Sequence, residues 1–128
     1  MERSIYKKLI EWKNKEGRRP LILNGARQVG KTYILQAFGK NEYKKLAFFS
    51  LDRNKKAVEV FEKGGSTTDM LMALSAISQT DITPNDTLVV LDEIQDCPKA
   101  LETLKFFCED VPDIHIIVAG SLLGMPSI

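Results

Sequence analysis

The chain has 128 residues, a length that suits one domain, and 44% of them are hydrophobic, which is typical of a globular protein. Its 18 basic and 17 acidic residues give a formal net charge of +1, so total charge does not favour a nucleic-acid or membrane partner. No apolar run approaches the roughly 20 residues of a membrane span, no signal-peptide pattern opens the chain, and Cys97 and Cys108 lack the spacing of a metal site or redox pair. We therefore expect a cytoplasmic protein with no membrane segment.

The first predicted element is an amphipathic helix at about residues 2–16. Its apolar residues Ile5, Leu9 and Trp12 share one face, and Gly17 is the expected stop. Residues 1–20 contain seven Lys or Arg and three Glu, which gives a local net charge of +4. A solvated helix face is the favoured interpretation of this charge, and a DNA-binding surface is the alternative.

A phosphate-binding loop is predicted directly after the first strand. Residues 20–24 form a short apolar strand, residues 25–32 read Gly-Ala-Arg-Gln-Val-Gly-Lys-Thr, and an apolar helical pattern follows. This is the G-x-x-x-x-G-K-T (Walker A) pattern in its strand–loop–helix setting, which disfavours a mere Gly-rich turn with a solvated lysine. Gly25 and Gly30 let backbone N–H groups approach phosphate oxygens. Lys31 is placed to reach the terminal phosphates of a bound nucleotide, and the Thr32 hydroxyl can ligate Mg²⁺. The residues expected to contact the nucleotide are Gly25, Ala26, Arg27, Gln28, Val29, Gly30, Lys31, Thr32 and Tyr33.

The middle of the chain continues the alternation of helices and strands. The helix after the loop is expected to end near Gly39, and an apolar run at 46–51 predicts the second strand. A helix over 54–63 is broken by Gly64-Gly65, and Ser66-x-x-Asp69 resembles a capping signal for another helix. Residues 83–86 form a turn.

A second motif, Thr-Leu-Val-Val-Leu-Asp-Glu at 87–93, predicts a strand that is buried on both faces and ends in two carboxylates (Walker B). Asp92 would hold the Mg²⁺ shell together with Thr32, and Glu93 would be the base that polarises the attacking water. Two acids that merely cap a strand end are the alternative. The upstream loop favours the catalytic interpretation.

A helix from Pro98 to about Asp110 and a strand over 114–119 complete the predicted elements. Cys108 lies on an apolar helical stripe, so a buried thiol is expected. His115, the only histidine, lies inside the last strand and is expected to be packed rather than catalytic. Strands that alternate with helices predict an α/β fold with a mostly parallel sheet between two helical layers, and ligands in such sheets bind at the carboxyl ends of the strands.

Three motifs in order resemble the AAA-type P-loop ATPases, and more narrowly a prokaryotic family described as ATP-binding proteins. They are the G-x-R-Q-V-G-K-T loop at 25–32, L-D-E-I-Q at 91–95 and G-S-x-L-G at 120–124. The resemblance implies a three-layer P-loop NTPase sandwich in which the loop strand neighbours the strand before Ser121, itself next to the Asp92 strand. It also implies that residues 1–128 are one partial ATPase core, truncated before the last core strand and the lid. In that family a C-terminal nuclease-like domain of unsettled function follows.

The resemblance assigns further roles. Ser121 would be the catalytic sensor of γ-phosphate or water, with an ordinary turn serine as the equal alternative, and Ser50 would orient the catalytic glutamate. AAA enzymes complete their site with arginines from a neighbouring subunit and from the lid, and Arg27 matches neither position. We therefore expect this chain to bind nucleotide better than it hydrolyses it. The partners that the resemblance allows are further copies of the chain in a homo-oligomer, or the C-terminal domain, and the source of any arginine stays open.

The leading functional hypothesis is a Mg²⁺-dependent ATPase core whose hydrolysis drives a conformational switch. The alternatives are a small-molecule P-loop kinase and a nucleotide-gated module that binds DNA or a protein. The Asp-Glu pair at 92–93 favours water activation over a kinase, and no N-K-x-D guanine-reading tetrad occurs. The loop recognises phosphates, so the preference for ATP over GTP is not set by the motif.

Overall fold

The structure is a computed structural model that describes residues 2–24 and 31–121. Within these ranges the strands form one parallel sheet in the order β1-β4-β3-β2. The strands are β1 (Leu21–Asn24), β2 (Lys45–Ser50), β3 (Thr87–Asp92) and β4 (His115–Gly120). This order places β4 between β1 and β3, and it confirms the neighbours expected for the phosphate-loop strand and the Asp92 strand.

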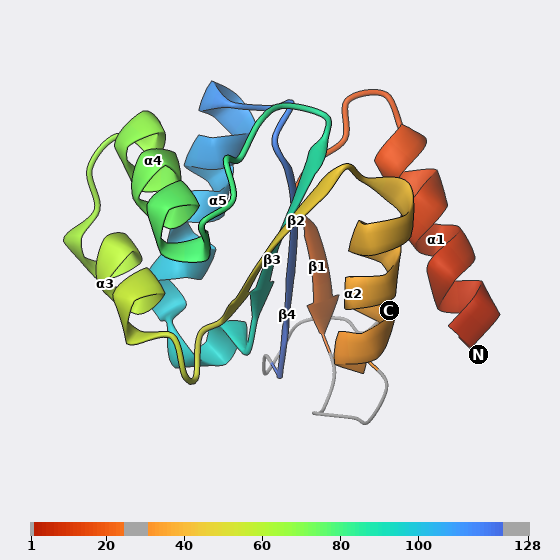
Figure 1. The fold of residues 1–128 in the computed structure, drawn as a ribbon, viewed down its shortest axis with the longest axis horizontal. Helices are drawn as coiled ribbons and strands as arrows, with labels where there is room; N and C mark the ends of the chain where they lie inside the picture. Colours follow the sequence, from red (N-terminus) through yellow and green to blue (C-terminus); the bar gives the residue numbers. More distant parts are fainter. Residues whose placement is uncertain (1, 25–30, 122–128) are drawn as a thin grey trace.

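Helices cover both faces of the sheet (Figure 1). On one face lie α1 (Glu2–Asn14) and α2 (Lys31–Glu42), and on the other lie α3 (Lys55–Lys63), α4 (Thr67–Ser78) and α5 (Pro98–Asp110). A short 3₁₀ helix, η1 (Ile94–Asp96), connects β3 to α5. The α/β fold is that of a P-loop NTPase-like protein, as predicted.

The two inner strands explain the unbroken apolar runs of the sequence. Every residue of β3 and β4 is buried, because each strand packs against helices on both faces. Leu88 and Val90 contribute to the core under α1 and α2, whereas Val89 and Leu91 face α3, α4 and α5. Alternate residues of one strand therefore stabilise two separate cores.

Local signals set most helix ends where the sequence predicts them. The Ser66 hydroxyl accepts a hydrogen bond of 3.0 Å from the backbone N–H of Asp69, so the predicted cap of α4 is confirmed. Asn54 caps α3 in the same way through the N–H of Ala57. Gly17 has a φ of +73°, which suits its predicted role after α1.

Several predicted ends differ from the structure. Helix α1 ends at Asn14 and not near residue 16, and β2 spans Lys45–Ser50 and not residues 46–51. Helix α2 does not end near Gly39 but continues to Glu42. Gly39 is buried inside the helix, where an added Cβ would lie 2.6 Å from Cδ1 of Leu46, so this glycine permits close packing on β2 instead of ending the helix. Strand β3 ends at Asp92, and Glu93 leaves it with φ 55° and ψ 49°, in the left-handed region.

Cys108 is less buried than predicted. Its side chain is half-buried, because the buried stripe of α5 runs through Ala100, Leu104 and Phe107, and Cys108 lies beside that stripe. Cys97, in contrast, is buried at the start of α5.

His115 is packed in the core, as predicted. Its Nδ1 lies 2.6 Å from the hydroxyl of Tyr43 and its Nε2 lies 3.2 Å from Oδ1 of Asn85. The Trp12 ring packs edge-on against it, with ring centroids 5.9 Å apart. One polar side chain at the start of β4 thus connects α1, the residue after α2 and the turn before β3.

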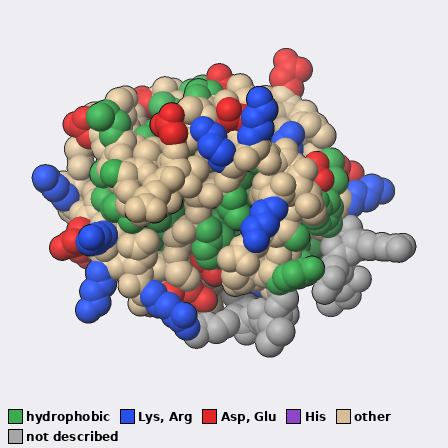
Figure 2. All heavy atoms as spheres, viewed as in Figure 1, with side chains coloured by type: hydrophobic (Ala, Val, Ile, Leu, Met, Phe, Trp, Pro, Cys, Tyr) green, Lys and Arg blue, Asp and Glu red, His purple; other side chains and the backbone are tan. Residues whose placement is uncertain are grey.

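The surface matches the near-zero net charge. Figure 2 shows basic and acidic side chains interspersed over the visible face of the molecule. Among the described residues, no helix is both long and apolar enough to cross a membrane.

Candidate functional site

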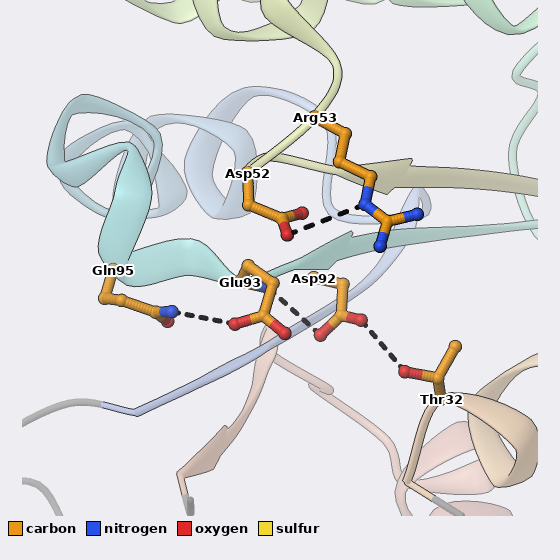
Figure 3. A network of polar contacts seen from close by, with 6 residues as sticks. All are labelled: Thr32, Asp52, Arg53, Asp92, Glu93 and Gln95. Carbon is orange, nitrogen blue, oxygen red and sulfur yellow. Dashed lines mark hydrogen bonds and ion pairs between the residues drawn. The ribbon is translucent and has the colours of Figure 1, made fainter. Parts of the chain in front are cut away.

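The candidate site lies at the carboxyl edge of the sheet, where β3 and β4 end and α2 begins. Lys31 is the first residue of α2, and Thr32 follows it. The Thr32 hydroxyl donates a hydrogen bond of 3.1 Å to Oδ2 of Asp92, across 60 residues of sequence (Figure 3). The structure therefore brings together the end of the first motif and the acid of the second.

Asp92 is buried, with 6% of its surface exposed. Burial raises the pKa of its carboxyl group, while hydrogen bonds from the Glu93 N–H and the Thr32 hydroxyl and the charge of Lys31 act in the opposite direction. The Glu93 N–H binds Oδ1 at 3.0 Å and Thr32 binds Oδ2, so each carboxylate oxygen has a partner. These partners fix the orientation of the carboxylate.

A hydroxyl oxygen and a carboxylate oxygen 3.1 Å apart are the donor types that Mg²⁺ prefers. Among the described residues there is no cluster of three or more His, Cys, Asp or Glu that could hold a metal ion by itself. A Mg²⁺ ion that takes most of its ligands from phosphate and water needs only one or two protein oxygens. Thr32 and Asp92 fit such a site.

Glu93 differs from Asp92 in burial and in partners. It is only half-buried, and its Oε1 accepts a hydrogen bond of 2.8 Å from Nε2 of Gln95. Its left-handed backbone is a conformation that costs a non-glycine residue about 1 kcal/mol or more. That turn ends β3 and starts η1, so Glu93 is held at the rim of the site while Asp92 stays inside it.

Gln95 also reaches the end of β4. Its Oε1 accepts a hydrogen bond of 3.1 Å from the backbone N–H of Ser121, across 26 residues of sequence. In the sequence, Gln95 stands out only as a member of the L-D-E-I-Q motif, which assigns it no role. The family resemblance placed Ser121 at this edge; its backbone N–H lies there in the structure, and the residue is exposed.

The loop after β2 adds two residues that sequence reasoning missed. Figure 3 shows Asp52 and Arg53 beside Asp92 and Glu93. Arg53 Nε lies 4.0 Å from Oδ2 of Asp52, and the Arg53 side chain is 88% exposed. Ser50 is paired with Asp92 in the strand register, which places this loop next to the acids. The sequence indicates these two residues only by their position, because residues that follow a parallel strand lie at the edge of the sheet where ligands bind.

The other predicted contacts are placed only in part. Tyr33 lies on the first turn of α2 and is 69% exposed. The predicted nucleotide contacts from Gly25 to Gly30, Arg27 among them, lie outside the described residues, as does the end of the G-S-x-L-G segment at 122–124.

The parallel sheet, its helical layers and the Thr32–Asp92 pair at the carboxyl edge define a P-loop NTPase-like protein. A family model described as "AAA domain" matches residues 17–127, which is most of the chain. The chain therefore belongs to the AAA domain family, whose members are generally ATPases, and this supports a nucleotide-binding function of the ATPase type. A search of curated proteins yields no match.

Proposed function

We propose that this chain binds ATP with Mg²⁺ and hydrolyses it to drive a conformational change in attached domains or partners. The observation that carries the proposal is the hydrogen bond between Thr32 and Asp92. It joins the start of the helix after the glycine-rich loop to the acid at the end of β3, which is the arrangement that a phosphate-bound Mg²⁺ requires.

Each residue then has a distinct role. Lys31 would bind the terminal phosphates, and Gly25 to Gly30 would surround the phosphates with backbone N–H groups. Thr32 and Asp92 would hold Mg²⁺, which when bound neutralises phosphate charge. Glu93 would orient the attacking water and accept its proton, and Ser121 would contact the γ-phosphate or that water.

Turnover by this chain should be slow. AAA-type sites take an arginine from a neighbouring subunit, and such a residue can be worth about 10³–10⁵ in rate. We propose that a homo-oligomer or a C-terminal domain, nuclease-like in the narrower prokaryotic family that the motifs resemble, completes the site in the cytoplasm.

The DNA-binding alternative rests on the basic residues of the first segment. The contacts of two of these residues favour a structural role over DNA binding. The Lys13 ammonium lies 5.1 Å from the centroid of the Tyr43 ring, and the Arg18 guanidinium lies 5.8 Å from that of Trp12. Arg18 also donates a hydrogen bond to the backbone oxygen of Lys13. These cations stabilise the packing of α1 on the domain.

Calorimetric titration of Mg²⁺-ATP and Mg²⁺-GTP tests the proposal. Lys31→Ala should abolish binding, whereas Lys40→Ala is the matched control, because Lys40 is an exposed lysine in the last turn of the same helix. Glu93→Gln should keep binding and slow hydrolysis. Equal affinity of wild type and Lys31→Ala, or equal hydrolysis by wild type and Glu93→Gln, would contradict the assigned roles.

A further inference from the structure

Gln95 makes two hydrogen bonds that connect two parts of the candidate site. We propose that Gln95 is a positioning residue that joins the Glu93 carboxylate to the end of β4, so that a displacement at Ser121 is passed to Glu93. This inference rests on the proposed function, because it concerns how the base of that reaction is held and released.

The two bonds use opposite ends of one primary amide. Nε2 of Gln95 donates to Oε1 of Glu93 at 2.8 Å, and Oε1 of Gln95 accepts from the Ser121 N–H at 3.1 Å (Figure 3 shows the first bond). A primary amide can donate to a carboxylate through its nitrogen and accept from a backbone N–H through its oxygen at the same time. A glutamate at this position would keep the second bond and lose the first.

The backbone that carries Gln95 is anchored. Ile94, its neighbour in η1, is fully buried in the core. The Asp96 N–H binds the Glu93 carbonyl oxygen at 3.0 Å, and the Cys97 N–H binds that of Ile94 at 3.0 Å. Because the turn is fixed, the Gln95 side chain is the part that can respond when its partners move.

Gly120 provides the space for the bridge. A Cβ added there would lie 2.9 Å from the backbone nitrogen of Ile94 and closer still to Oε1 of Gln95. The absent side chain lets η1 and the Gln95 amide lie directly against the end of β4. The bridge therefore depends on packing between two elements and not only on flexible side chains.

The two hydrogen bonds of Gln95 link Ser121 to Glu93 through a single side chain, and the functional consequence follows from this link. Ser121 is exposed at the rim where the sensor of γ-phosphate is proposed. If nucleotide shifts the Ser121 backbone, Oε1 of Gln95 loses or changes its partner, and the amide that holds Glu93 turns with it. Glu93 would then change its orientation according to the state of the nucleotide.

Two variants test whether Gln95 positions Glu93 or only stabilises the fold. Gln95→Ala removes both bonds, while Gln95→Glu keeps an acceptor for Ser121 and places a second carboxylate beside Glu93. Asp96→Asn is the local control, because Asp96 is exposed in the same turn. All variants are made in the whole 128-residue chain.

The kinetic test is a double-mutant cycle between Gln95→Ala and Glu93→Gln, with hydrolysis at saturating Mg²⁺-ATP and affinity by calorimetry. A lost hydrogen bond to a charged group predicts a roughly tenfold fall in kcat for both Gln95 variants, with affinity within about twofold of wild type. In the Glu93→Gln background the Gln95→Ala change should have no further effect. Additive losses, or a wild-type kcat in both Gln95 variants while Glu93→Gln is slow, would overturn the coupling. Equal hydrolysis by wild type and Glu93→Gln would instead refute the proposed function.

A nitrogen-15 NMR experiment tests the bridge without any turnover. The Gln95 side-chain amide signals are identified by their loss in Gln95→Glu. They should shift in Glu93→Ala and on addition of Mg²⁺-ATP to wild type. The Ser121 N–H should be protected from exchange in wild type and Gln95→Glu, and exposed in Gln95→Ala. Side-chain amide signals that stay in place in Glu93→Ala would overturn the bridge.

Discussion

Lowering the pH from 7 to 5 should destabilise this protein through one residue, His115. It is the only histidine of the chain and is 4% exposed. The Tyr43 hydroxyl lies beside Nδ1 and the Asn85 amide oxygen beside Nε2, so the neutral ring with its proton on Nε2 satisfies both partners. A second proton, on Nδ1, would face the hydroxyl that donates to that nitrogen.

The size of the effect follows from the pKa of His115. The pKa of His115 is lowered from 6.5 to about 4, mainly by burial and in addition by the charges of Arg18 and Lys13, while the charge of Asp113 opposes them. The unfolded chain therefore takes up the proton first. The stabilisation is complete above about pH 6.5 and is lost as the pH falls to about 4. At pH 5 the loss amounts to about 2 kcal/mol, and below pH 4 it approaches about 3 kcal/mol.

Urea unfolding followed by tryptophan fluorescence measures this directly. Trp12 is the only tryptophan, and its ring packs edge-on against His115. With an m-value near 2 kcal/mol per molar urea, the midpoint should fall by about 1 M between pH 7 and pH 5. His115→Gln is the control, because its amide can still pair with Tyr43 and Asn85 but does not titrate.

The test compares how steeply the urea midpoints of wild type and of His115→Gln fall with decreasing pH. Carboxylates that titrate near pH 5 contribute equally to wild type and His115→Gln, so the difference between the two curves isolates the histidine. Parallel midpoint curves from pH 7 to pH 5 would show that His115 is not held neutral by its surroundings, and the reasoning from burial would be refuted.

Four further predictions concern packing and capping. Gly120→Ala should lower the free energy of unfolding by about 1–3 kcal/mol, because its Cβ meets the Ile94 backbone. Gly39→Ala should cost less, since its Cβ meets only the end of a leucine side chain and alanine favours a helix, and thermal melts of the two variants compare them. Ser66→Ala should cost about 1 kcal/mol through the lost cap of α4, as measured by urea unfolding against Ser66→Asn, which can restore the cap. Phe61→Ala should cost about 3–5 kcal/mol, because the ring is 1% exposed and packs edge-on against a second aromatic ring, whereas Phe61→Leu in the same assay should cost far less.

The fold was predictable where one residue pattern has one physical solution. The unbroken apolar runs of β3 and β4 require burial on both faces, and only an inner strand of a parallel sheet between helices provides it. The capping serine and the proline at the start of α5 act through neighbours in sequence, so these ends were predictable as well. The neighbours of β4, however, came from family resemblance and not from periodicity.

The errors arose where tertiary contacts override local signals. Gly39 resembles a helix stop in sequence, but the helix continues to Glu42, and the absent side chain leaves room for Leu46 of β2. Cys108 shares the spacing of an apolar stripe but lies at its margin. In the site, Thr32 and Asp92 were predictable from their motifs, while the Gln95 bridge was not, because its bond to Ser121 spans 26 residues and follows no spacing rule.

Strand β4 connects two of the polar networks among the described residues. At its amino end His115 contacts Tyr43 and Asn85, and after its carboxyl end the Ser121 N–H binds Gln95. The strand between them is buried throughout and paired with a strand on each side, so it cannot slide without breaking both ladders and the His115 contacts. If a nucleotide displaces the Ser121 backbone, β4 stays in place, and the Gln95 side chain, which is bonded to Ser121, is free to rotate. The displacement at the end of β4 would therefore change the orientation of Glu93 and not the packing of the core.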